Sequence, residues 1–468
     1  MKKFKLPDTL VLLAFVLAVF ALLTWLVPAG EFEREVKTIN GSERELVVSG
    51  TYETTESNPA GFGDLVLASI RGFQDSADII VFIFMVAGGF SIIIRTGAIE
   101  AGLQSVVRWS GDHAGRKRWV IPILITLFSL GGATFGMSEE GLVFVLVTLP
   151  LSFALGYDSL VGVSIPFVGA GVGFAGAFLN PFTVGIAHGI SGLTPFSGWE
   201  YRLVVWVLFT GAAIVWLMRY AAKVEKDPTR SLMYAADQKS PHRETKNQHE
   251  RITRRQQAVL VLLFVGLAML VYGVNVWGWY INEIAGLFLV LGIASGIVYR
   301  MPLQEGVDAL VEGARDMVKV GLVIAMAKGV LILAQDGRII DTILNAMASV
   351  LGQVPKTVSV SLMFGVQTTL NFFMPSGSGQ AALTMPIMAP LSDLLGISRQ
   401  TAVLAFQLGD GLSNMIIPTS GVTMGVLTLA NIPYATWFRW FGRFFLLLCG
   451  LAILVLLPPV LFFAWTAG

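Results

Sequence analysis

The chain has 468 residues, of which 54% are hydrophobic and 13% are charged, with a mean hydropathy of +0.71. These values exclude an ordinary soluble protein, and the net charge of +1 gives no sign of a nucleic-acid partner. The single cysteine, Cys449, can form no internal disulfide, so the fold does not depend on an oxidising compartment. The composition therefore predicts a polytopic membrane protein.

Apolar runs of the length that a bilayer requires recur along the chain, and the first is expected to be a retained helix rather than a cleaved signal. About nine transmembrane helices are predicted, at residues 10–27, 79–95, 159–179, 201–219, 257–274, 281–299, 317–334, 401–430 (interrupted) and 444–464. Two further apolar stretches, 119–155 and 357–396, contain central polar breaks. Each is predicted to be a re-entrant hairpin of two half-helices, which gives an all-α fold.

Two polar segments separate these runs. Residues 28–77 form the predicted external loop, in which Asn40-Gly41 between alternating segments predicts a type I′ β-hairpin. Residues 221–256 are rich in charged and amide side chains and predict a mobile, basic cytoplasmic linker. The other predicted units are a first transmembrane helix at 1–27, a first repeat at 78–220, linking and scaffold helices at 257–300, and a second repeat at 301–468.

Lys and Arg side chains are distributed unevenly among the predicted loops. With the N-terminus in the cytoplasm, the cytoplasmic segments hold 23 of these residues and the external segments hold 8. Cytoplasmic loops normally carry the excess. The distribution therefore predicts nine crossings, two hairpins that do not pass through the bilayer, and an external C-terminus.

The two halves of the chain resemble each other. An offset of 241 residues aligns Gly72 with Gly313, Asp75 with Asp316, and Gly88 with Gly329. The predicted topology makes these repeats antiparallel, because the crossing at 79–95 runs inward and its counterpart at 317–334 runs outward. Inverted repeats with interrupted helices are typical of secondary transporters.

Each repeat contains a glycine-flanked break followed by a second break built on Asn and Pro. Within hydrocarbon such breaks are tolerated where they lie in protein or line a wet cavity. Half-helix N-termini suit a carboxylate, and freed carbonyl and hydroxyl oxygens suit sodium. The alternative is that Gly and Ser only allow close helix packing, but the symmetric placement favours binding. The predicted substrate-binding residues are Ser138, Glu139, Glu140, Asn180, Thr183, Ser376, Gly377, Ser378, Gly379, Gln380, Asn414, Pro418, Thr419 and Ser420, with a sodium site near Ser138, Asn180, Ser376, Asp410 and Asn414.

Ionisable residues at membrane depth are costly and are mostly functional. Glu139 and Glu140 either reach the headgroup region or bind a cation, a proton or an amino group, and we favour binding for at least one of them. Asp410 invites a similar role. Lys328 is expected to have a structural partner or to snorkel, and His188 is expected to be a helix-end residue rather than a proton relay.

Motifs for other functions are missing from the sequence or stand in the wrong context. The segment 171–176 matches a dinucleotide-binding pattern, but it lies inside a predicted crossing and indicates helix packing. The chain has no Walker motif, and its four histidines and one cysteine form no zinc pattern. The sequence therefore predicts neither an enzyme nor an ATP-driven pump, and no cofactor beyond Na⁺ or H⁺ as a coupling ion.

Several motifs together resemble a known family. They are Val27-Pro28-Ala29-Gly30-Glu31-Phe32, Gly136-Met137-Ser138-Glu139-Glu140, the run from Ser376 to Pro390, Gly409-Asp410-Gly411-Leu412-Ser413-Asn414 and Ile417-Pro418-Thr419-Ser420-Gly421. Over nearly the whole chain the sequence resembles the YfcC-like branch of the C4-dicarboxylate anaerobic carrier (DcuC-like) family, within the ion transporter superfamily. The resemblance implies a homodimer in the bacterial inner membrane, with scaffold and transport domains that move by an elevator mechanism.

The resemblance also bears on the substrate. Dicarboxylate carriers of the superfamily have Ser-Asn-Thr at both hairpin tips, whereas this chain has Ser-Glu-Glu and Ser-Gly-Ser. Added carboxylates would repel a dianion, and some relatives are described as arginine/ornithine exchangers. We therefore expect a carrier of a small carboxylate-bearing metabolite, with amino acids ahead of C4-dicarboxylates. A channel is the alternative, and a membrane-embedded enzyme is a weaker one.

Overall fold

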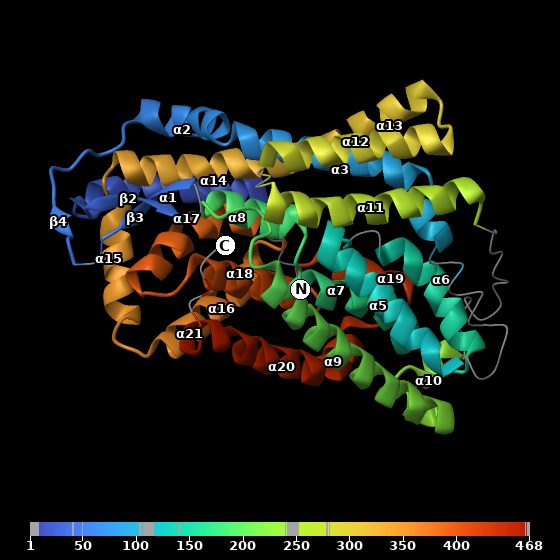
Figure 1. Ribbon diagram of the computed structural model, residues 1–468. Helices are drawn as coiled ribbons and strands as arrows, with labels where there is room; N and C mark the ends of the chain where they lie inside the picture. Colours follow the sequence, from blue (N-terminus) through green and yellow to red (C-terminus); the bar gives the residue numbers. More distant parts are fainter. Residues whose placement is uncertain are drawn as a thin grey trace.

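The computed structural model describes residues 9–39, 42–48, 50–102, 105, 117–138, 141–238, 240, 252–277, 279, 281–463 and 465. This part of the chain is mainly helical, as predicted, with two small two-stranded antiparallel sheets near the N-terminus (Figure 1). The helices are α1 (Thr9–Leu26), α2 (Phe62–Asp75), α3 (Ala77–Arg95), α5 (Lys117–Phe135), α6 (Gly141–Ala154), α7 (Ser159–Ala175), the π-helix η2 (Pro181–Gly185), α8 (Ile186–Ile190), α9 (Trp199–Lys226), the 3₁₀ turn η3 (Pro228–Arg230), α10 (Tyr234–Asp237), α11 (Arg254–Val276), α12 (Ile281–Tyr299), α13 (Leu303–Asp316), α14 (Val318–Asp336), α15 (Ile340–Leu351), α16 (Lys356–Phe373), α17 (Gly377–Leu394), α18 (Arg399–Ser413), α19 (Gly421–Leu429), α20 (Tyr434–Leu456) and α21 (Pro458–Leu461). The strands are β1 (Gly30–Glu31), β2 (Arg34–Ile39), β3 (Ser42–Val47) and β4 (Glu53–Thr54).

Within the described residues, five helical segments are long and apolar enough to cross a bilayer. They are Ala77–Arg95, Trp199–Lys226, Ile281–Tyr299, Leu303–Asp336 and Tyr434–Leu461. Both predicted hairpins are interrupted as expected, because α5 and α6 are separate helices and so are α16 and α17. The predicted crossing at 401–430 is also split, into α18 and α19.

The helices form two groups that lie side by side (Figure 1). In one group, α14 packs against α1 and α2, and α3 packs against α12 and α13. In the other, α7 packs against α5, α6, α9 and α18, while α18 packs against α16, α17 and α20. The contact between α14 and α17 joins the two groups.

Glycines allow the closest helix contacts in the first group. A Cβ atom on Gly72 of α2 would lie 2.1 Å from the carbonyl oxygen of Ala325 on α14. A Cβ atom on Gly313 of α13 would lie 2.4 Å from the carbonyl oxygen of Ala87 on α3. Small residues commonly allow such close backbone approach in membranes. The two glycines are a pair that the 241-residue offset aligns.

Two predicted boundaries are wrong. The external loop predicted at 28–77 ends before Phe62, because α2 is an amphipathic helix that buries Ala68 and Gly72 against α14. The crossing predicted at 444–464 corresponds to the span Tyr434–Leu461, whose first helix, α20, begins earlier, at Tyr434. Its first turns bury aromatic side chains in the core, so they continue the helix instead of forming a loop.

The predicted mobile linker at 221–256 is also wrong in its first half. Helix α9 continues to Lys226, and the following turn folds back against the start of α7. The buried Asp158 carboxylate accepts hydrogen bonds from the Tyr220 hydroxyl at 2.5 Å and from the Ser231 hydroxyl at 2.6 Å. These bonds hold the segment after α9, whereas residues 239 and 241–251 lie outside the described part of the chain.

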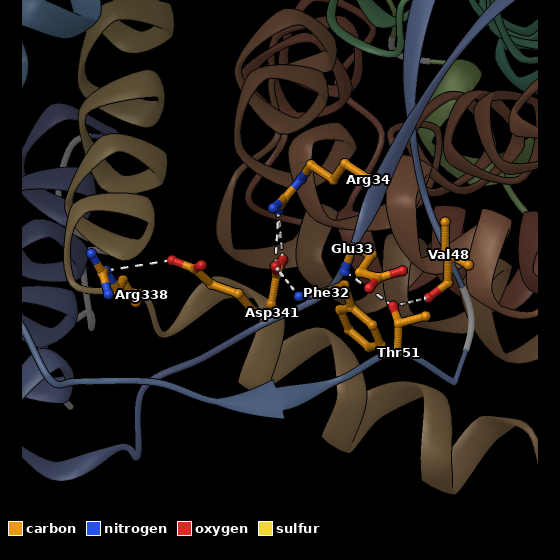
Figure 2. Close-up of polar contacts among 8 residues, drawn as sticks. Phe32, Glu33, Arg34, Val48, Thr51, Arg338 and Asp341 are labelled. Carbon is orange, nitrogen blue, oxygen red and sulfur yellow. Dashed lines mark hydrogen bonds and ion pairs between the residues drawn. The ribbon is translucent and has the colours of Figure 1, made fainter.

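The predicted β-hairpin is present as β2 and β3, which pair from Arg34 with Val47 to Ile39 with Ser42. Its turn residues, 40 and 41, lie outside the described residues. The loop is fastened to α15, as Figure 2 shows, because the buried Asp341 accepts hydrogen bonds from the Arg34 guanidinium and the Phe32 backbone N–H, both at 2.9 Å.

Asp341→Ala is expected to lower the free energy of unfolding by about 1–3 kcal/mol, because it leaves these two donors without their acceptor. Deuterium uptake at the Phe32 amide should rise. Glu31→Ala is the matched control: it removes a half-exposed ion pair with Arg338 at 3.4 Å, worth about 0–1 kcal/mol. Equal effects of the two substitutions would contradict this view of the loop.

Candidate functional site

The first break follows α5. Gly136 has a φ of 72°, a left-handed conformation that glycine tolerates and that ends the helix. A Cβ atom there would lie 2.8 Å from Oδ1 of Asn180. Ser138 lies in the break and is partly buried, whereas Glu139 and Glu140 lie outside the described residues. The structure therefore brings the first tip against the second polar segment of the same repeat.

That second segment is a single turn of π-helix, η2, a rare form that often occurs at functional sites. Asn180 caps it, because its Oδ1 accepts a hydrogen bond from the Phe182 N–H at 2.9 Å. Its Nδ2 atom and the hydroxyl oxygen of Thr183 are buried and have no hydrogen-bond partner among the described residues. Both polar atoms remain available to a ligand.

The second break lies between α16 and α17. Ser376 caps α17, since its hydroxyl accepts a hydrogen bond from the Gly379 N–H at 3.3 Å, and residues 377–380 form the first turn. Ser378 is partly buried in this turn. The Gln380 side-chain amide donates to Oε1 of Gln367 at 2.6 Å and to its carbonyl oxygen at 2.8 Å. Gln380 thus ties the two arms of the hairpin together.

Asp410 lies in α18 and is completely buried. Its Oδ1 accepts a hydrogen bond from the Asn414 side-chain amide at 2.9 Å, and its carbonyl oxygen accepts one from Asn371 at 3.0 Å. Its Oδ2 has no hydrogen-bond partner within the described chain. A buried carboxylate oxygen without a partner is costly, so its retention points to a ligand.

The two breaks meet at Gly377. A Cβ atom on this residue would lie 2.6 Å from Oδ2 of Asp410 and 2.6 Å from Cγ2 of Thr183. Thr183 belongs to the first repeat, whereas Gly377 and Asp410 belong to the second. Thr183 is 1% exposed and Asp410 is 0% exposed, so both are closed to solvent, whereas Gly377 is partly exposed.

The remaining predicted residues lie farther along the second repeat. Pro418 and Thr419 lie between α18 and α19, and Ser420 caps α19 by accepting a hydrogen bond from the Thr423 N–H at 3.4 Å. The Thr423 hydroxyl donates to the carbonyl oxygen of Asn414. These residues therefore support the end of α18.

The donor set at the meeting point fits a small hard cation. Asp410 provides a carboxylate oxygen, a ligand type that such cations prefer and one that can also hold a proton. Thr183, whose methyl group lies near Gly377, carries a buried hydroxyl without a hydrogen-bond partner among the described residues. Among the described residues, no group of three or more His, Cys, Asp or Glu side chains could hold a metal ion. A transition-metal centre therefore has no support in this part of the chain.

Some polar residues of the site escaped the sequence reasoning. Gln407 donates a hydrogen bond to the Phe174 carbonyl at 2.6 Å, Gln367 accepts one from Gln380 after the second break, and Asn371 donates one to the Asp410 carbonyl. The sequence pattern could have identified them, because Gln407, Asp410 and Asn414 are spaced by three and four positions within an apolar run. Gln367 and Asn371 are likewise four positions apart. Polar residues on one face of a predicted crossing mark its buried side.

His188 and Lys328 lie in different surroundings. His188 is buried in the last turn of the short helix α8, as expected for a helix-end residue. Lys328 lies on α14, where it makes no hydrogen bond or ion pair with any described residue. No structural partner for Lys328 is therefore seen among the described residues, and the alternative expectation, a snorkelling side chain, stays a prediction.

Comparison with known proteins supports the fold and the family. The sequence is 35% identical over 473 residues to the putative basic amino acid antiporter YfcC of Escherichia coli (strain K12), covering 94% of this chain and 93% of that protein. The fold is similar to the crystal structure of the Alcanivorax borkumensis YdaH transporter, with a TM-score of 0.74, 17% identity and coverage of 99% and 100% of the two chains.

A second solved structure has the same fold. Neisseria gonorrhoeae MtrF, described in its structural report as illuminating a class of antimetabolite efflux pumps, gives a TM-score of 0.73 at 16% identity, with coverage of 98% and 96%. Residues 6–460 match the C4-dicarboxylate anaerobic carrier family, DcuC. The chain is thus a membrane transporter that belongs to the DcuC family, with a YfcC-type protein among its relatives.

Proposed function

We propose that this chain is an ion-coupled secondary carrier of a small amino acid, with basic amino acids ahead of C4-dicarboxylates. The substrate lies where the two breaks meet, between Asn180 and Thr183 on one side and Ser376, Gly377 and Asn414 on the other. Three helical segments begin or end there, so backbone N–H and carbonyl groups are available to both ends of a zwitterion.

The observation that carries this proposal is the unpartnered Oδ2 of Asp410. It lies against Gly377 and Thr183, at the contact between the two repeats, and it is fully buried. A carboxylate in this position favours a cation and disfavours a dianion. Asp410 and Thr183 would hold the coupling ion, Na⁺ or H⁺, whose positive charge would offset the buried carboxylate.

The choice of substrate rests on charge. The relative from E. coli is named a putative basic amino acid antiporter, whereas the family is described as C4-dicarboxylate carriers. Asp410 lies near the second tip, and the sequence carries an acidic pair, Glu139-Glu140, in the motif of the first break. The excess of acidic residues supports a cationic or zwitterionic substrate, and a C4-dicarboxylate remains the second candidate.

The two helix groups support a moving-domain mechanism. In this proposal the group with α2, α3, α13 and α14 is the scaffold, and the group with both breaks is the transport domain of an elevator. The close glycine contacts favour a rigid scaffold, because backbone atoms approach there without intervening side chains. We further propose a homodimer in the bacterial inner membrane, surrounded by lipid, with the N-terminus cytoplasmic and the C-terminus external.

An uptake panel in proteoliposomes tests the proposed function. Purified full-length protein is reconstituted and offered labelled arginine, ornithine, lysine, succinate or fumarate, with and without a sodium or proton gradient. We expect saturable uptake of a basic amino acid that is stimulated by the same amino acid inside the vesicle. Uptake restricted to dicarboxylates would overturn the substrate assignment, and unsaturable flux without counterflow would indicate a channel.

A further inference from the structure

A cavity of 320 Å³ lies between the two helix groups, apart from the meeting point of the breaks. One wall is a single face of α14, because its lining residues Ile324, Lys328, Leu331 and Gln335 are spaced by four, three and four positions. The facing wall is α17, which contributes Ala382, Met385, Pro386, Ala389 and Pro390. A volume of this size is within the range of small-molecule sites.

The cavity leads from the external loop toward the second break. At one end it is lined by Arg34 of β2 and Asp341 of α15, the pair shown in Figure 2. At the other end lies Ile324, whose neighbour Val323 packs against Gly379 in the first turn of α17. The α14 lining runs from Ile324 to Gln335, a separation of 11 positions or about 16 Å at 1.5 Å per residue. The cavity therefore extends along α14 from the loop side of the protein toward the first turn of α17, without including the residues of the candidate site.

Most of the charge in this cavity is already neutralised within the protein. Arg34 pairs with Asp341 at 2.9 Å, and Arg399 pairs with Asp393 at 2.6 Å. Arg399 also donates to the Ser191 carbonyl at 2.8 Å. These side chains have their partners, so they shape the cavity and have little capacity left for a ligand.

Two charged side chains remain. Lys328 and Asp75 line the cavity, and neither makes a hydrogen bond or an ion pair with any residue that the structure describes. A lysine within an apolar helix is costly unless it binds something or reaches water. Asp75 is exposed and interacts electrostatically with Arg71, whose ion pair is with Asp336. A lysine and a carboxylate that make no ion pair within the described chain match, in the same cavity, a ligand that carries both charges.

We propose that this cavity is a vestibule that binds a zwitterionic or basic amino acid before it reaches the breaks; this inference rests on the proposed function. Lys328 receives the carboxylate of the ligand, and Asp75 receives its cationic group. A dicarboxylate fits poorly, because one of its carboxylates would face Asp75. The vestibule lies on the side of the external loop, so it serves entry from outside.

Lys328→Met tests this role, because methionine keeps most of the side-chain volume and removes the charge. The external KM for the basic amino acid found in the uptake panel is expected to rise about tenfold or more, measured in right-side-out vesicles. The KM in inside-out vesicles and the kcat should stay near the wild-type values. Lys319→Met is the matched control, since it removes a lysine of the same helix that does not line the cavity.

Three further outcomes decide the proposal. Lys328→Arg keeps the positive charge and should retain the external KM within about threefold. A rise in KM equal to that of Lys328→Met indicates a packing role and overturns the proposal.

Asp75→Asn should raise the KM for a basic amino acid, and a lower KM would mean a dianionic ligand and also overturn the proposal. An unchanged KM in Lys328→Met refutes the vestibule alone, whereas a wild-type protein that moves no amino acid refutes the proposed function as well.

Discussion

Gly72→Ala is expected to destabilise the protein strongly. The added Cβ would lie 2.1 Å from the Ala325 carbonyl oxygen and 2.7 Å from the Gly329 nitrogen, so both clashes are with the backbone of α14. The helices must move apart, because neither atom belongs to a side chain that could rotate away. We expect a loss of about 3 kcal/mol or more in the free energy of unfolding, at the upper end for overpacked interiors.

The measurement is the thermal melting temperature of the purified variant in detergent, together with its yield of monodisperse protein. Gly286→Ala is the control, because a Cβ on this exposed glycine of α12 meets nothing within 4 Å. Alanine favours helix by up to about 1 kcal/mol over glycine, so this variant should be at least as stable as wild type. If Gly72→Ala had the same melting temperature as Gly286→Ala, the close contact between α2 and α14 would be wrong.

Asp410→Asn is expected to abolish transport without destabilising the fold. The substitution removes the charge at the meeting point of the breaks but keeps the shape of the side chain. We expect the transport rate to fall about 100-fold or more, equivalent to about 2.7 kcal/mol. The melting temperature should be unchanged or higher, since an unpaired buried carboxylate is itself destabilising.

Counterflow and thermal melting of the same preparation separate the two effects. Asp316→Asn is the matched control, because it removes an exposed carboxylate at the end of α13 and should leave transport intact. Wild-type transport by Asp410→Asn would show that the carboxylate is not part of the site. A large fall in melting temperature would show instead that the charge holds the fold together.

Much of the fold and the position of the breaks could be predicted from local sequence. The interruption after Phe135 and the one before Gly377 both follow from glycine and polar residues inside apolar runs, which local chemistry decides. The same holds for the strand pairing on either side of Asn40-Gly41.

What the sequence could not predict depends on contacts between distant segments. Helix α2 has only 14 residues, and it packs on α14 through the small residues Ala68 and Gly72 while its larger apolar side chains are exposed, so no long apolar run marks it in the sequence. The sequence of the segment after α9 indicates a mobile linker, because its anchor, Asp158, is far away in sequence. That Gly377 touches both Thr183 and Asp410 is likewise a product of tertiary packing.

A double-mutant cycle tests most directly whether the two breaks form one site. The Kd of the substrate from the uptake panel is measured by calorimetry for wild type, Thr183→Ala, Asp410→Asn and the double variant. A single site predicts a coupling free energy of about 1 kcal/mol or more between the two residues. Effects that add within about 0.5 kcal/mol would mean that the breaks act independently, which would contradict the account.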